Sequence, residues 1–109
     1  MSRTDDIDYV DPEDVTLTEA MLGYDILVDG VHTGSIEGLP GQLDHIEVHP
    51  YWEDKGVARA ALDTFIELSR EHGISKLTTN DAVHPAIEHI LASEGFDERQ
   101  EDIGWVKEL

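Results

Sequence analysis

The stretch that decides the fold runs from Leu43 to Ala58 and reads LDHIEVHPYWEDKGVA. From Ile46 to His49 apolar and polar side chains alternate up to Pro50, which is typical of a half-buried strand. A short polar loop follows, and Gly56 then opens a run with helical spacing. The start of a helix leaves backbone N–H groups without acceptors, so this strand–loop–helix order predicts a place where an anion can bind. Many helices begin with small residues for packing alone, so this signal leaves both interpretations open.

Strict alternation sorts the side chains of the strand at 43–49 into two sets. One face is expected to carry Asp44, Ile46 and Val48, and the other His45, Glu47 and His49. Neighbours on one face lie about 6.8 Å apart, so the second set is poorly spaced to close around one metal ion. We therefore expect no metal site, and a histidine or Glu47 on this face is a candidate to move a proton.

The rest of the chain predicts an α/β fold around this stretch. Alternating residues at 24–28 and 31–36 flank Asp29-Gly30, a pair that suits a tight hairpin because both residues tolerate positive φ. Apolar spacing predicts a helix over 56–72, a strand over 74–79 and a second helix over 85–94. Phe96 and the 103–105 segment are expected to supply two last strands, which gives the order β-β-β-α-β-α-β-β.

Composition limits what this domain can do. The chain has 109 residues, 25 Asp plus Glu, 7 Lys plus Arg, no cysteine and a formal net charge of −18. Nucleic-acid backbones and anionic membranes would meet a surface of their own sign, so neither is an expected partner. Six acids crowd residues 1–14, which are expected to be a mobile tail, with one compact domain over 15–109.

The acidic excess has two explanations. Acids spread along the whole chain with few lysines suit a protein that stays soluble in concentrated salt, where the screening length falls to about 3 Å at 1 M. This favours the high-salt cytoplasm of a halophile, and the acidic N-terminus is unlike a secretion signal. The alternative is a specialised acidic surface, such as a nucleic-acid mimic.

Several motifs together resemble the GNAT N-acetyltransferase superfamily. They are Val48-His49-Pro50, Lys55-Gly56-Val57-Ala58, Asn80, and Glu94-Gly95-Phe96 at the end of the second helix. The resemblance covers roughly residues 22–106, with the spacing from Val48 to Gly56 that the family has. It implies a mixed, mostly antiparallel sheet with splayed middle strands and two main helices. The N-terminal strand and two helices of a full-length member are expected to be absent, or reduced to a remnant near 15–17.

The resemblance implies an acetyl-CoA-dependent transfer of an acetyl group to an amine. Acetyl-CoA would be held by the strand end and the helix start, at Val48, His49, Lys55, Gly56, Val57, Ala58, Arg59, Ala60 and Asn80. The pyrophosphate would sit on the amides of Lys55 to Ala60, and the pantetheine arm would pair like an added strand beside Val48.

The resemblance also points to catalytic candidates and to two departures from the family. Asp44 stands four residues before Val48, where many members carry an acid that orients or deprotonates the amine, and Glu47 is a second candidate base. Glu53 replaces the usual Arg or Gln of the loop. Leu91 replaces the tyrosine that often protonates the leaving thiolate.

These departures leave a second function open, a GNAT-like module that holds an acyl-CoA or a protein partner without catalysis. Asp44 is equally compatible with an ordinary surface acid in a chain so rich in acids. A shortened sheet with exposed Tyr24 or Trp105 could also dimerise to cover apolar surface.

Overall fold

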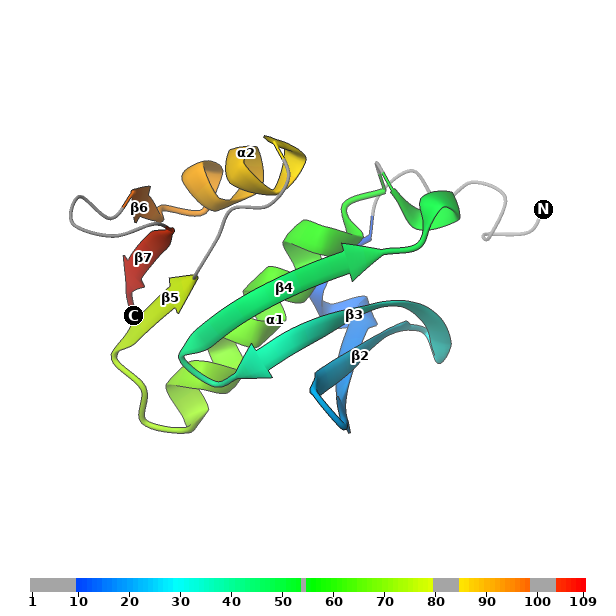
Figure 1. Ribbon diagram of the computed structural model, residues 1–109. Helices are drawn as coiled ribbons and strands as arrows, with labels where there is room; N and C mark the ends of the chain where they lie inside the picture. The colour runs from blue at the N-terminus through cyan, green and yellow to red at the C-terminus, as the bar shows by residue number, and fades with distance from the viewer. Residues whose placement is uncertain (1–9, 54, 80–84, 99–103) are drawn as a thin grey trace.

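One seven-stranded sheet and two α-helices make up the part of the chain that the structure describes (Figure 1). The computed structural model describes residues 10–53, 55–79, 85–98 and 104–109. The strands are β1 (Val15–Ala20), β2 (Gly23–Val28), β3 (Val31–Leu39), β4 (Gln42–Val48), β5 (Lys76–Thr79), β6 (Asp97–Glu98) and β7 (Trp105–Glu108). The helices are α1 (Val57–Glu71) and α2 (Pro85–Ser93), and short 3-10 turns cover Pro12–Asp14 and Pro50–Trp52.

The sheet is mixed and mostly antiparallel, as predicted. Its strand order is β1-β2-β3-β4-β5-β7-β6, and only β4 and β5 pair in parallel. The hairpin predicted at Asp29-Gly30 is confirmed, because these two residues have φ of 50° and 85° and join β2 to β3. Such φ values match the turn to the twist of the flanking strands.

The N-terminal strand is a full strand and not the remnant that was expected. All six residues of β1 pair with β2, from Val15 opposite Val28 to Ala20 opposite Gly23. Only Val15 and Leu17 supply an apolar alternation here, and Val15 alone is fully buried. The strand forms because β2 offers an edge to pair with. This cause lies outside the six residues of β1, so their own pattern does not reveal it.

A β-bulge at Asp44 interrupts β4. Glu37 of β3 faces His45, but the next residue, Gly38, faces Leu43, so Asp44 is the extra residue. The strict alternation expected for this strand is therefore wrong at its beginning, and Leu43 and Ile46, three residues apart, are both buried. Gly38 allows the bulge, since its φ is +138° and a Cβ there would lie 2.2 Å from the carbonyl oxygen of Gln42.

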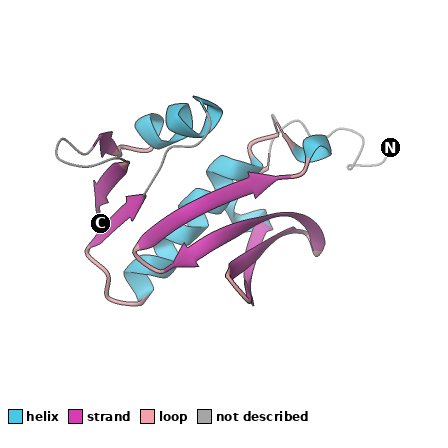
Figure 2. Ribbon diagram, viewed as in Figure 1, coloured by secondary structure: helices cyan, strands magenta, loops and turns pink. Residues whose placement is uncertain are grey.

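The bulge also marks the point where β4 leaves β5. The parallel pairing consists of Gln42 with Thr78 and Leu43 with Thr79, and no described residue continues it beyond Leu43. A bulge bends its strand and increases the local twist, so β4 turns away after this point. Figure 2 shows the end of β5 beside the beginning of β4. This short pairing is what the splayed middle strands of the resemblance would leave.

Helix α1 lies behind β3 and β4 in Figure 1 and supplies much of the core. The apolar spacing predicts a stripe of Ala58, Ala61, Leu62, Phe65, Ile66 and Leu68, of which the middle four are buried and Ala58 and Leu68 only partly so. Val57 and Ala60 are buried in addition. Phe65 is fully buried, and its ring meets the ring of Tyr24 edge-on at 6.0 Å. Tyr24 and Trp105 are partly buried against this core, so neither is the exposed aromatic surface that was expected to favour dimerisation.

The compact part of the chain begins earlier than residue 15. Val10 is only 3% exposed, and its backbone N–H donates to the carbonyl oxygen of Lys55 at 2.7 Å. Residues 10–14, assigned from the sequence to the tail, therefore cover the start of α1. The remainder of the predicted tail, residues 1–9, lies outside the described residues.

The bulge predicts how one glycine contributes to stability. Gly38→Ala should lower the free energy of unfolding by about 1–3 kcal/mol, because alanine resists this φ and its Cβ would collide with Gln42. Gly73→Ala is the control, since Gly73 also has positive φ (+76°) but has open space around its Cβ position. Urea unfolding at fixed KCl measures both. A loss in Gly38→Ala no larger than in Gly73→Ala would contradict the role given to the bulge.

Candidate functional site

The end of β4 is held firmly before the chain enters α1. Val48 pairs with Gly34 of β3, and the backbone N–H of His49 donates to the carbonyl oxygen of Thr33 at 2.8 Å. The backbones approach closely here, since a Cβ on Gly34 would lie 2.1 Å from the carbonyl oxygen of Glu47. Pro50 then starts a 3-10 turn, in which the N–H of Trp52 donates to the oxygen of His49 at 2.8 Å.

Helix α1 begins with groups suited to an anion. Gly56 caps it in a left-handed conformation, with φ of +82°, and contributes no side-chain hydrogen bond. The first turn contains no acid. The leading N–H groups of a helix carry a positive partial charge, so the amides of Val57, Ala58 and Arg59 can bind a phosphate without a carboxylate in the turn itself. The N–H of Ala60, also expected at this site, instead donates to the carbonyl oxygen of Gly56 at 2.9 Å.

The two cations predicted near this anion site have other contacts. The ammonium group of Lys55 lies 5.1 Å from the centre of the Tyr51 ring. Arg59 forms an ion pair of 3.0 Å with Glu94, just beyond the end of α2. Glu53, the acid at the usual Arg or Gln position, is exposed, while Asp54 and Asn80 lie outside the described residues.

Asp44 and Glu47, the candidate bases, have different surroundings. Asp44 is partly buried in the bulge, and the side-chain amide of Gln42 donates to its Oδ1 at 2.8 Å. Glu47 is exposed and faces Ser35 across the β3–β4 pair. Of the two carboxylates, Asp44 stands at the point where β4 leaves β5 and is oriented by a neighbour.

The nearby histidines contact one another instead of surrounding an ion. The His49 ring lies 5.0 Å from the His32 ring, and Nε2 of His32 is 3.1 Å from Asp25 Oδ1. Across the described ranges, no three His, Asp or Glu side chains come close enough to hold a metal ion.

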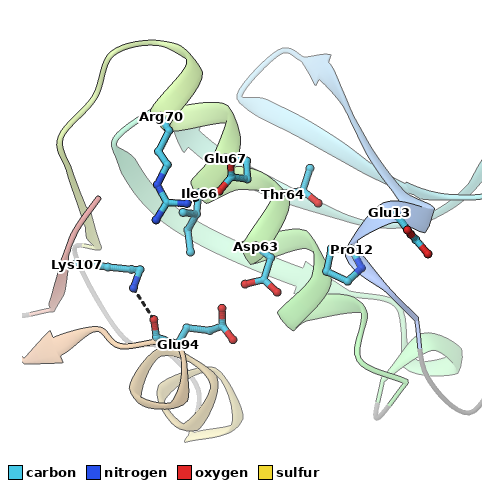
Figure 3. A pocket seen from close by; sticks show the side chains of 9 residues that line it. All are labelled: Pro12, Glu13, Asp63, Thr64, Ile66, Glu67, Arg70, Glu94 and Lys107. Atoms are coloured by element: carbon cyan, nitrogen blue, oxygen red, sulfur yellow. Dashed lines mark hydrogen bonds and ion pairs between the residues drawn. The ribbon is translucent and has the colours of Figure 1, made fainter.

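A second charged cluster joins α1 to the end of α2, and the sequence reasoning missed it. Figure 3 shows the carboxyl groups of Asp63 and Glu94 turned toward each other. Lys107 of β7 donates to the backbone oxygen of Glu94 at 2.8 Å. A cavity of about 490 Å³ adjoins them, lined by Pro12, Glu13, Asp63, Thr64, Ile66, Glu67, Arg70, Glu94 and Lys107. Asp63 follows Arg59 by one helical turn, which is the only sequence signal of this cluster.

Solved structures with the same arrangement are N-acetyltransferases. A GCN5-related N-acetyltransferase from Rhodopseudomonas palustris matches 79% of this chain and 60% of its own, with a TM-score of 0.64 and 21% identity. A tandem GNAT protein from the clavulanic acid biosynthesis pathway matches 84% of this chain and 31% of its own, with a TM-score of 0.57 and 22% identity. The ribosomal-protein-S18-alanine N-acetyltransferase from Escherichia coli matches 86% of this chain and 66% of its own, with a TM-score of 0.55 and 18% identity.

The chain has the GNAT fold. It spans less than two thirds of the length of each of these three structures. No family model matches the sequence, and no curated protein matches it. None of the helices in the described ranges has the length and apolar character needed to cross a membrane.

Within the GNAT fold, Leu91 departs from the family pattern in a buried place. Its side chain is 1% exposed, and its carbonyl oxygen accepts a hydrogen bond from the N–H of Phe96 at 3.0 Å. A leucine has no proton to donate, so the position that often carries the tyrosine acid serves packing in this chain.

The Asp63–Glu94 cluster predicts a pH dependence of stability. Burial, and then the neighbouring Glu94, raise the pKa of Asp63 from 3.8 to about 7. The folded chain therefore keeps a proton that the unfolded chain releases in acid, so this contribution to stability is complete below about pH 4 and is lost as the pH rises through 7. Asp63→Asn should flatten the decline between pH 5 and pH 8 and raise the melting temperature at pH 8.

Thermal unfolding at constant KCl measures both effects. Glu71→Gln, a change at an exposed acid near the other end of α1, is the control and should keep the wild-type slope. If Asp63→Asn declines as steeply as the wild type, the cluster does not hold this proton.

Proposed function

We propose that this chain is an acetyl-CoA-dependent N-acetyltransferase that acts on the amine of a small molecule or a protein. The observation that carries the proposal is that the described pairing of β4 with β5 ends at Leu43, five residues before β4 ends at Val48. This leaves the backbone of residues 45–48 without a described strand partner on that side, and the same strand leads into the start of α1. An extended ligand can add to such an edge as a strand, with its anionic end at the helix.

The residues present fit an acyl-CoA donor. The amides of Val57, Ala58 and Arg59 would hold the pyrophosphate, where the positive φ of Gly56 and the absence of acids in the first turn leave the backbone accessible. The pantetheine arm would pair beside Val48 and His49. Glu53 has the wrong sign for a diphosphate, but its charge is exposed and salt screens it.

Acetyl transfer requires a base for the amine and a proton for the leaving thiolate. The amine nitrogen bonds to the thioester carbonyl carbon, the carbon–sulfur bond breaks, and the nitrogen gives up a proton. We assign that proton to Asp44, which the amide of Gln42 orients. Because Leu91 is apolar and buried, the thiolate would take its proton from water.

Two parts of this proposal concern the setting of the reaction. No described helix lies in front of β3 and β4 in Figure 2, so a bulky acceptor can approach from that side. The net charge of −18 supports a high-salt cytoplasm, where screening removes much of the self-repulsion.

A non-catalytic acyl-CoA-binding module is the second candidate, and Leu91 is the observation that favours it. Thiol release from acetyl-CoA, screened over a panel of amines in molar KCl, separates the two functions. A rise in melting temperature with acetyl-CoA but no thiol release would favour the module. If acetyl-CoA causes neither a rise in melting temperature nor thiol release, both functions are excluded.

Changing the charge at the start of α1 should change donor binding. Ala58→Glu places a carboxylate in the first turn, where it suits the helix but repels a diphosphate, so most of the melting-temperature rise caused by acetyl-CoA should be lost. Ala92→Glu, the same change at an exposed position of α2, should keep that rise. Glu53→Gln should improve donor affinity by about twofold, the size of an exposed charge effect.

Unliganded melting temperatures show whether Ala58→Glu harms the fold. Glu53→Gln tests the same site without touching a packed position. If neither substitution changes the binding of acetyl-CoA, the diphosphate binds elsewhere on the protein.

The two candidate bases are separated by paired variants. Asp44→Asn should lower turnover by about 10²–10⁴-fold while the stabilisation by acetyl-CoA remains, because a general base acts only in the chemical step. Glu47→Gln should leave turnover close to the wild type, since its side chain is exposed. Steady-state thiol release with the best amine of the panel measures both. The reverse pattern would make Glu47 the base.

A further inference from the structure

Strand β1 forms one edge of the sheet, and its pairing shows which backbone groups face outward. Ala20 and Gly23 flank the two-residue turn, and the N–H of Asp29 donates to the oxygen of Asp14 at 3.3 Å. Hydrogen-bonded pairs alternate along an antiparallel ladder, so the even-numbered residues of β1 bond to β2. The odd-numbered residues Val15, Leu17 and Glu19 direct their N–H and C=O groups away from the sheet.

Most of these outward groups have no acceptor or donor among the described residues. The N–H of Val15 is the exception, since it donates to the oxygen of Pro12. The C=O of Val15 and both backbone groups of Leu17 and Glu19 remain. Unpaired groups on a sheet edge are a template for another strand.

The same edge is nearly neutral in a strongly acidic molecule. Residues 15–22 contain one charged side chain, Glu19, whereas 29% of the whole chain is charged. Thr16, Thr18 and Ala20 are exposed on β1, and the turn after it exposes Met21 by 98% and Leu22 by 69%. Neither gatekeeper lysine nor proline interrupts residues 15–22, although natural edges are commonly protected in this way.

We propose that β1 pairs with β1 of a second copy of this chain, antiparallel, about a two-fold axis at Leu17. This register places Thr16 opposite Thr18 of the partner subunit, a favourable cross-strand pair, and Val15 opposite Glu19 of the partner subunit. The two Glu19 side chains then stand four residues apart, about 14 Å, so the edge's only charge meets no like charge. A second copy matches this edge because the register sets neutral residues opposite each other at 16/18 and 17/17, and Glu19 opposite neutral Val15.

The outward backbone groups determine how many hydrogen bonds this pairing can form. Leu17 exchanges two bonds with Leu17 of the partner subunit, and each Glu19 N–H donates to the C=O of Val15 across the axis. The proposal concerns an interface far from the chemistry of β4, so it does not depend on the proposed acetyl transfer.

Removing one outward N–H tests the edge itself. Glu19→Pro deletes two of the four hydrogen bonds but none to β2, and should weaken dimerisation by about tenfold or more. Glu19→Ala removes the same side chain and keeps the N–H, so it should dimerise at least as well as the wild type. Sedimentation equilibrium over a range of protein concentrations, in KCl that keeps the chain folded, measures both.

A charge pair tests the register and does not rely on proline. T16E/T18K puts opposite charges across the axis twice and should tighten the dimer by about tenfold, whereas T16E/T18E puts like charges there and should weaken it as much. An axis at Thr18 would instead set lysine against lysine in T16E/T18K and weaken it. A wild-type chain that stays monomeric at every concentration, a dimer unchanged by both E19P and T16E/T18E, or a dimer weakened by T16E/T18K overturns the proposal.

Discussion

The extra residue in β4 is the constraint on which the proposed site depends. With Asp44 inserted, β4 bends, and its parallel pairing with the described residues of β5 ends just before the bulge, at Leu43. Gly38 across the ladder makes the insertion possible, because no side chain fits where its Cβ would stand. Without the bulge β4 would be straighter and less twisted beyond Leu43, and the backbone of residues 45–48 would point in another direction.

The other end of the divergence is fixed by Gly41. Its N–H donates to the hydroxyl of buried Ser69 on α1 at 3.0 Å, and its C=O accepts from the N–H of Thr78 at 3.1 Å. The turn before β4 is thus tied to both α1 and β5, so the strands can separate only in the direction of Val48. The opening is therefore set by packed backbone and not by loop composition, which leaves loop residues such as Glu53 free to vary in charge.

The parts of the fold that follow from local chemistry could be predicted from the sequence. Asp29-Gly30 specifies its turn by φ alone, and the stripe that contains Phe65 specifies the buried face of α1. The bulge was missed although the sequence carries a sign of it, since two polar residues, Asp44 and His45, separate the buried Leu43 and Ile46 and break strict alternation. Strand β1 was underestimated for another reason, since its stability comes from pairing with β2 and not from its own pattern.

The site residues also divide into those that could be predicted from the sequence and those that could not. The anion-binding start of α1 is readable from Gly56 and Ala58, because helix geometry dictates where N–H groups are exposed. The partners of Arg59 are not readable, since Glu94 lies 35 residues further along the chain and reaches it only through the packing of α2. Because the Arg59 guanidinium is paired with the Glu94 carboxylate, the proposed diphosphate would be bound chiefly by backbone amides. Backbone amides do not titrate, so their hydrogen bonds to a phosphate stay available at any pH, which suits a binding site on a surface with this many acids.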